Sequence, residues 1–169
     1  QLIRQYKSYY RADVLGLKAG TYSVKVVPVN AEGTEIAGAN TASNLVVKSY
    51  NREGFAHFKY DGVGAYNNDG TLKAGAKVLY ITAKTAKPET ITGLQAIIDA
   101  YQKGEDTTPI VFRIIGKVSL SDLDGISSSE EGLQIKGKGA HSVMNMTVEG
   151  VGDDATVYGF GFLLRNTKS

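Results

Sequence analysis

The sequence predicts a mostly β protein, and three observations support this fold class. Glycine occupies 20 of the 169 positions, about 12% against a usual share near 7%, without a collagen-like period. Several segments alternate apolar and polar residues, which is typical of half-buried strands. Only one segment has a clear helical period. Together these features predict many tight turns between short strands, as in β-sandwiches, barrels and solenoids.

The first 50 residues contain three segments with the two-residue period of strands. They are residues 8–17, 22–29 and 44–50. Turn-forming clusters at residues 18–20 and 30–33 separate them, which predicts an antiparallel β-meander. Tyr22 closely follows the first of these turns. This arrangement resembles the tyrosine corner of fibronectin type III and other immunoglobulin-like sandwiches, in which the hydroxyl bonds to the chain upstream.

A complete sandwich of that kind needs about seven strands and about 100 residues, so we expect only part of one here. Either another part of the protein completes the sheet, or the chain begins inside a domain. The charge supports a boundary near residue 50, because residues 1–50 carry a net +3 and residues 51–169 a net −1. We therefore predict two units: residues 1–50 as the C-terminal strands of a fibronectin III-like sandwich, and residues 51–169 as a second β domain.

The second unit begins with residues 55–75, which have no sustained period and predict irregular structure. A buried strand is expected at residues 77–82. The helical period follows, with apolar residues at i, i+3, i+4 and i+7; these are Leu94, Ile97, Ile98 and Tyr101. Thr92 is the expected N-cap and Gly104 the expected stop. Such a helix, with one apolar stripe, should lie as a lid on the body of the domain.

Short strand-like units, most of them closed by Gly or Asn, follow the helix at regular intervals. They are residues 109–118, 132–137, 146–150, 156–159 and 162–166. No hairpin dipeptide such as Asn-Gly separates them, so they fit the rungs of a parallel β-helix better than a meander. The helix would then cap the exposed end of the solenoid and block edge-to-edge pairing.

Three of these stretches, in order, resemble the opening of secreted pectate lyases. They are residues 91–100 (ITGLQAIIDA), 109–118 (PIVFRIIGKV) and 146–157 (MTVEGVGDDATV). The resemblance covers about residues 54–169 and implies the cap helix and first coils of a right-handed parallel β-helix. The preceding strands then look like the fibronectin-type module that accompanies such lyases in bacterial glycan-degrading proteins.

The resemblance also implies a chemistry. Pectate lyases cleave polygalacturonate by β-elimination, with Ca²⁺ held by Asp carboxylates and an Arg as the base, although the reference pKa of Arg is above 12. In the family these residues lie on later coils, and no segment here matches them. We therefore assign no catalytic or cofactor-binding residue and leave metal ligands open. We expect an N-terminal piece that is inactive alone, with the rest of its own polypeptide as partner. The alternative is a non-catalytic carbohydrate-binding or adhesin module with a β-helical stalk.

Charge, hydropathy and cysteine content disfavour several other classes of protein. A net charge of +2 with interspersed signs disfavours a nucleic-acid or membrane-surface protein. No apolar run approaches the roughly 20 residues of a membrane span. The N-terminus reads as neither an initiator Met nor a signal peptide, so we expect a mature product or a fragment. The absence of cysteine excludes disulfides and thiolate metal sites. The family resemblance implies a secreted, periplasmic or cell-surface location in a bacterium.

Several motifs have a weak functional interpretation beside a structural one. Residues 150–155 fit a loose G-x-G-x-x-A nucleotide pattern, but strand-like residues follow, so a β-helix turn is favoured. Asp122 and Asp124 resemble the start of a Ca²⁺ loop whose later positions fail the EF-hand pattern. Asp153 and Asp154 could touch a cation, although adjacent turn carboxylates are usually solvated.

The histidines, one arginine and five tyrosines complete the candidates. For His57 and His141 we favour packing over catalysis, because no supporting motif surrounds them. Arg165 has the residue type of a lyase base, but a solvent-facing position at a rung end is the simpler interpretation. A sugar-stacking platform could be formed by tyrosines, but strand and interface packing is favoured; these are Tyr6, Tyr9, Tyr10, Tyr60 and Tyr66.

Overall fold

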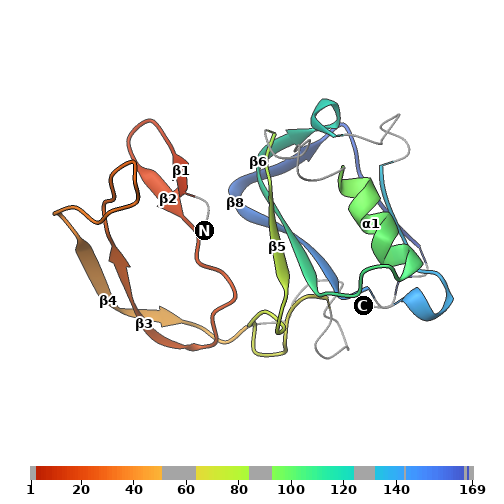
Figure 1. Ribbon diagram of the computed structural model, residues 1–169, viewed down its shortest axis with the longest axis horizontal. Helices are drawn as coiled ribbons and strands as arrows, with labels where there is room; N and C mark the ends of the chain where they lie inside the picture. Colours follow the sequence, from red (N-terminus) through yellow and green to blue (C-terminus); the bar gives the residue numbers. More distant parts are fainter. Residues whose placement is uncertain are drawn as a thin grey trace.

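The computed structural model describes residues 3–50, 64–83, 93–123, 132–142, 144–165 and 167. The protein is mostly β, as predicted, and the described residues form four small sheets. None of these sheets closes on itself. The finer predictions, a partial sandwich followed by a β-helix, therefore stay predictions. Figure 1 shows the strands of residues 3–47 gathered beside the remaining strands and the helix.

Residues 3–50 form two separate antiparallel hairpins. Strand β1 (Ile3–Gln5) pairs with β2 (Tyr10–Ala12), and β3 (Gly20–Val26) pairs with β4 (Asn40–Val47). The predicted single meander is therefore wrong, because β2 and β3 do not pair. The chain between them leaves the sheet at Gly16, whose φ is +79°. A Cβ at Gly16 would lie 3.4 Å from Leu72, so this connection packs against the next region instead of continuing a strand.

The tyrosine-corner contact is present. The Tyr22 hydroxyl donates a hydrogen bond of 2.7 Å to the Lys18 carbonyl, four residues upstream. On the β3–β4 ribbon, Tyr22 stands opposite Leu45, and Val24 stands opposite Ala42. Directly opposite residues share a face, so one face of this two-stranded ribbon is apolar. A ribbon of two strands is marginally stable without a partner layer.

Among the described residues from 77 onward, all strand pairing is parallel. Strands β5 (Lys77–Ile81), β6 (Ile110–Ser119) and β8 (Met146–Tyr158) form one sheet with β6 in the middle. Strands β7 (Leu133–Lys136) and β9 (Phe162–Arg165) form another. The prediction of parallel pairing in place of hairpins is confirmed, and the chain alternates between the two sheets in the order β6, β7, β8, β9.

Strands β6 and β8 each change direction partway along. Their register runs from Ile110 opposite Met146 to Ile115 opposite Val151, and it resumes with Lys117 opposite Thr156. Four residues of β8, 152–155, thus stand opposite the single Gly116 of β6. Gly116 and Gly152 both have positive φ, +64° and +89°, which glycine adopts without the steric cost of a Cβ. The bend lets both strands turn the same corner while they stay paired.

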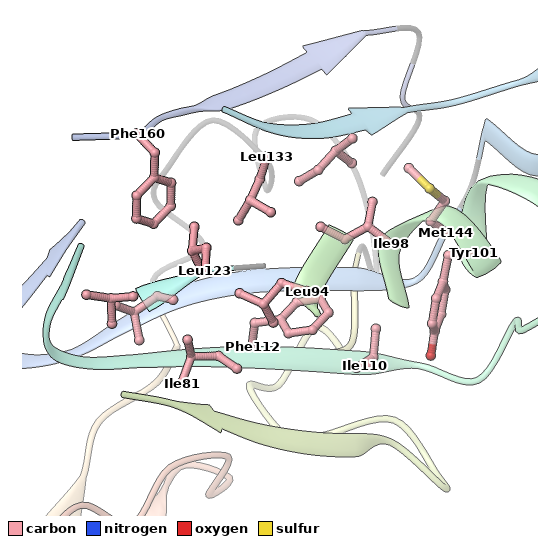
Figure 2. Close-up of a cluster of buried hydrophobic side chains, with 13 residues drawn as sticks. Ile81, Leu94, Ile98, Tyr101, Ile110, Phe112, Leu123, Leu133, Met144 and Phe160 are labelled. Carbon is pink, nitrogen blue, oxygen red and sulfur yellow. The ribbon is translucent and has the colours of Figure 1, made fainter. Parts of the chain in front are cut away.

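Helix α1 (Leu94–Lys103) covers the core, as predicted. Its N-cap is Gly93, without a side-chain cap bond, so the predicted Thr92 cap is wrong. Gly104 ends the helix in the left-handed conformation, as predicted. In Figure 2, side chains of β5 and β6, of α1 and of β7 point toward one another. The 13 buried residues of this core are Ile81, Leu94, Ile98, Tyr101, Ile110, Phe112, Ile114, Val118, Leu123, Leu133, Ile135, Met144 and Phe160.

Helix α1 also occupies the free edge of β7. The Gln95 amide accepts a hydrogen bond from the Gln134 N–H at 2.8 Å and donates one to the Gln134 carbonyl at 3.0 Å. The Gln102 side chain accepts a bond from the Lys136 N–H. These two glutamines take the place of a neighbouring strand, because the other edge of β7 pairs with β9. The helix therefore blocks pairing at this edge. Two 3₁₀ turns, η2 (Leu120–Asp122) and η3 (Gly139–Ser142), complete the described elements.

Candidate functional site

Three polar side chains lie in register across the face of the parallel sheet that is turned away from the helix. Tyr80 of β5 stands opposite Arg113 of β6, and Arg113 stands opposite Glu149 of β8. Residues directly opposite one another in neighbouring strands share a face and lie about 4.8 Å apart. The sheet register therefore brings together residues that are far apart in the sequence.

Arg113 is the centre of this group and is only 4% exposed. Its Nε donates to Glu149 Oε1 at 2.8 Å, and one terminal nitrogen donates to the Tyr66 hydroxyl at 3.0 Å. The Tyr66 hydroxyl donates to the same Glu149 oxygen at 2.6 Å. The guanidinium also lies 6.0 Å from the centre of the Tyr80 ring. Arg113, Tyr66 and Glu149 thus form a closed triangle of hydrogen bonds.

The segment that supplies Tyr66 is pinned onto the sheet. The Ala65 N–H donates to Thr147 Oγ1 at 3.0 Å, and Lys73 Nζ donates to Asn145 Oδ1 at 2.8 Å. Gly64 has a φ of +64°, and a Cβ there would collide with the Thr147 hydroxyl. Only glycine therefore allows this close approach to β8.

The electrostatics of the triangle keep its protons in place. Burial raises the pKa of Tyr66, and the hydrogen bond to Glu149 raises it further. Burial lowers the pKa of Arg113, but its hydrogen bonds to Tyr66 and Glu149 outweigh this effect and raise it overall. Both groups stay protonated at neutral pH. The arrangement serves to hold the 64–73 segment on the sheet.

A second polar cluster joins the β1–β2 hairpin to β8. Arg4 donates to Asp13 at 2.9 Å and to Asp154 at 3.0 Å, and Arg11 binds Asp13 at 2.8 Å. The Tyr6 hydroxyl donates to Asp154 at 3.0 Å. The hydrogen bond from Tyr6 and that from Arg4 outweigh burial and lower the pKa of Asp154.

Gly152 is required where this cluster meets β8. Its φ is +89°, and a Cβ there would lie 2.8 Å from an Arg4 nitrogen and 3.2 Å from an Arg11 nitrogen. The bend in β8 thus creates the space in which the two guanidinium groups lie.

The structure separates the motifs that the sequence suggested. Residues 150–155 lie inside β8, not between a strand and a helix, so they cannot present a helix N-terminus to phosphate. Asp122 accepts the Ser119 N–H at 2.7 Å and caps η2, whereas Asp124 lies outside the described residues. Asp154 is committed to Arg4 and Tyr6, as described above. Its neighbour Asp153 has no ion-pair partner among the described residues.

The other candidates are dispersed. His57 and Tyr60 lie outside the described residues, and His141 is in η3. Arg165 ends β9, opposite Lys136. Tyr6 stacks on Tyr9, with ring centres 4.7 Å apart. Because Tyr66 is buried in the triangle, it does not join Tyr6 and Tyr9 in one platform.

Within the described ranges, no three His, Cys, Asp or Glu side chains converge on a common point. The calcium expectation, which belongs to the parent enzyme, stays a prediction. The same residues include no helix long and apolar enough to cross a membrane.

Sequence reasoning named three residues of the polar clusters, Tyr6, Tyr66 and Asp154, but in other roles. It missed the arginines and Glu149. Arg113 interrupts the apolar run of residues 110–115, and this was the available signal. Its partners Tyr66 and Glu149 follow from the parallel register, which a single sequence does not specify. Arg4 had no comparable signal, because it binds Asp154 across about 150 residues of chain. Arg11 joins the cluster through Asp13, two residues away.

Comparison of the chain with protein-family models, curated proteins and solved structures gave no match.

Proposed function

We propose that residues 64–165 form the capped first coils of a right-handed parallel β-helix in a pectate lyase-like polysaccharide lyase. One observation carries this proposal: the chain passes twice through three strand segments in the same order. The first pass is residues 110–115, 117–119 and 133–136, and the second is residues 146–151, 156–158 and 162–165. Each segment of the second pass pairs in parallel with its counterpart in the first. Repeated parallel stacking of this kind is typical of β-solenoids, and crossover connections between parallel strands are right-handed in about 98% of cases.

The two ends of this stack differ in a way that supports the proposal. At one end α1 covers the edge of β7 through Gln95 and Gln102. At the other end, the edges of β8 and β9 that face away from β6 and β7 have no paired strand among the described residues. Unpaired parallel edges are templates for further strands. We infer that later coils of the parent protein stack on β8 and β9.

The proposed reaction is β-elimination in polygalacturonate. A base removes the proton next to the uronate carboxylate, the electron pair forms the double bond, and the glycosidic oxygen on the β carbon departs. By resemblance to pectate lyases, the parent would hold Ca²⁺ on Asp carboxylates and use an Arg as base, in later coils. Arg113 does not meet that role, because its proton is held by Glu149 and Tyr66. This chain alone should therefore be inactive.

For residues 3–50 we propose part of a fibronectin III-like sandwich. The Tyr22 contact with Lys18 supports it, as does the apolar face of the β3–β4 ribbon, which a second sheet would cover. A secreted, periplasmic or cell-surface location is proposed with the lyase.

The test is an assay for the unsaturated product of polygalacturonate cleavage with Ca²⁺ present and with Ca²⁺ chelated. We expect the full-length parent to form product only with Ca²⁺ and the 169-residue chain to form none. Activity of this chain would contradict the assignment of catalysis to later coils. A folded parent that forms no product would overturn the lyase proposal.

The second candidate is a non-catalytic glycan-binding or adhesin module with a β-helical stalk. The parallel stacking of β8 and β9 on the strands before them supports this candidate equally, because a stalk needs only further coils of the same kind. A parent that binds glycan and stacks further coils, yet releases no product, would support this alternative.

A further inference from the structure

An open cavity of about 600 Å³ lies where the C-terminal end of α1 meets the end of β7. Its lining residues are Gln102, Lys103, Lys136, Lys138 and Gly139. Three of these five side chains are lysines, and all three are exposed. The cavity is on the helix side of the molecule, away from the triangle around Arg113.

The lysines of this cavity outnumber the acidic side chains close to it. None of the three lysines forms an ion pair with an acidic side chain of the described residues. Asp99, one turn before Lys103, accepts hydrogen bonds from the amides of Gln95 and Gln102 at 2.8 and 2.6 Å. Glu105, just past the helix, forms no ion pair with Lys103 among the described contacts. The local excess contrasts with a net charge of only +2 over 169 residues.

Two hydrogen bonds hold the end of β7 beside the cavity. The Gln102 side chain accepts the Lys136 N–H and ties α1 to β7. On the other side of β7, the Gly137 N–H donates to the Arg165 carbonyl at 2.8 Å. A preformed site loses less conformational entropy on binding than a flexible one does.

Further cations lie close to Lys136. Lys138 is two residues away in the sequence, just past the end of β7. Lys136 stands opposite Arg165 on the next strand, about 4.8 Å away across the sheet. Such a group of cations suits an extended ligand with repeated negative charges better than a single anion. The long lysine stems also offer apolar surface, against which the C–H faces of sugar rings can pack.

We propose that this cavity binds an acidic oligosaccharide through its carboxylates, away from the catalytic centre of the parent. The choice of a uronate rests on the proposed function; the choice of an anionic ligand rests on the lysines alone.

The test is calorimetric titration of the 169-residue chain with tetragalacturonate and with its fully methyl-esterified form, which lacks the charges. We expect binding of the acid form only, weakened by added salt. The double variant Lys136→Ala/Lys138→Ala should bind at least tenfold more weakly. The matched control is Lys25→Ala/Lys48→Ala, which removes two exposed lysines from β3 and the end of β4. It should bind like the unsubstituted 169-residue chain. Circular dichroism checks that both variants keep the secondary structure of the unsubstituted chain.

Four results would overturn the inference. They are equal binding by the double variant, equal binding of the methyl ester, full competition by inorganic phosphate at equal concentration, and tighter binding of a single-stranded DNA oligonucleotide. Failure of the lyase proposal looks different, because an inactive parent whose binding of tetragalacturonate still depends on Lys136 and Lys138 would leave the cavity assignment intact.

Discussion

The two regions of this chain bury their apolar side chains to different extents. Residues 64–165 enclose a core between a parallel sheet, a helix and a second sheet, whereas no described side chain of residues 3–50 is fully buried. The apolar side chains of the hairpins stay open to solvent; Val46 is 73% exposed and Val26 is 65% exposed. Phe112 on β6, by contrast, is 2% exposed. Burial of apolar area is the main source of stability, so the parallel region should carry most of it.

The first region is nevertheless attached to the second by specific contacts. Arg4 and Tyr6 bind Asp154 on β8, and Gly16 lies against Leu72. These contacts are polar or small, and exposed ion pairs contribute about 0–1 kcal/mol each. The comparison thus predicts a stable parallel region that holds a weaker pair of hairpins.

The largest expected difference between the regions is in apolar truncation. Phe112→Ala should lower the free energy of unfolding by about 3–5 kcal/mol, because it removes a buried ring and leaves a cavity. Val46→Ala should change it by less than about 0.5 kcal/mol. Urea unfolding followed by circular dichroism measures both. Similar losses of unfolding free energy in the two variants would contradict the claim that the parallel region carries most of the stability.

Next in size is the loss of an arginine from each region. Arg113→Leu leaves Glu149 and the Tyr66 hydroxyl without their buried donor and should cost about 2–3 kcal/mol. Arg11→Leu removes a more exposed partner of Asp13, with a cost of about 0.5–1 kcal/mol expected. Thermal unfolding of the two variants side by side makes the measurement. A smaller effect at Arg113 than at Arg11 would contradict the structural role of the triangle.

As pH falls, the first region should lose its stabilising ion pair before the parallel region does. The pKa of Asp154 is lowered by its bonds from Tyr6 and Arg4, so its contribution to stability is present above the unfolded pKa of about 3.9 and is lost as pH falls through the lower folded value. The bond from Lys77 lowers the pKa of Asp106 to about 2, so that pair, in the parallel region, persists to stronger acid.

Amide NMR signals of β1 and β2 should therefore shift on acidification below about pH 4 before those of β6 do. Asp154→Asn should produce the same shifts at neutral pH, whereas Asp153→Asn, at the adjacent position, should not. If the amide signals of β1, β2 and β6 shifted at the same pH, Asp154 would not control the attachment of the first region on its own.

The smallest expected effect concerns the corner of the first region. Tyr22→Phe removes the bond to the Lys18 carbonyl and should lower the stability of the β3–β4 ribbon by about 0.5–1 kcal/mol. Tyr10→Phe is the control, because the Tyr10 hydroxyl has no hydrogen-bond partner in the described part of the chain. Hydrogen-exchange rates of the β3 amides measure the effect of both variants. Equal rates in the two variants would show that the Tyr22 bond does not stabilise the ribbon.

The sequence predicted the parallel region better than the first one. The apolar stripe of α1, the strand at residues 77–82 and the parallel pairing of the later strands are all confirmed. These features depend on local period and turn spacing, which a sequence shows directly. The predicted meander was wrong because β2 and β3 do not pair, and the segment between them meets the next region at Gly16. The sites were harder still, since Arg113 meets Glu149 and Arg4 meets Asp154 only through tertiary register.

Native-state hydrogen exchange of the whole 169-residue chain tests the central claim most directly. We predict that the amides of α1 and β6 exchange only through global unfolding. The amides of β3 and β4 should exchange at least about 100-fold faster, a difference of about 3 kcal/mol in opening free energy. Equal protection of β3 and β6 would contradict the claim that the parallel region holds the stability of this protein.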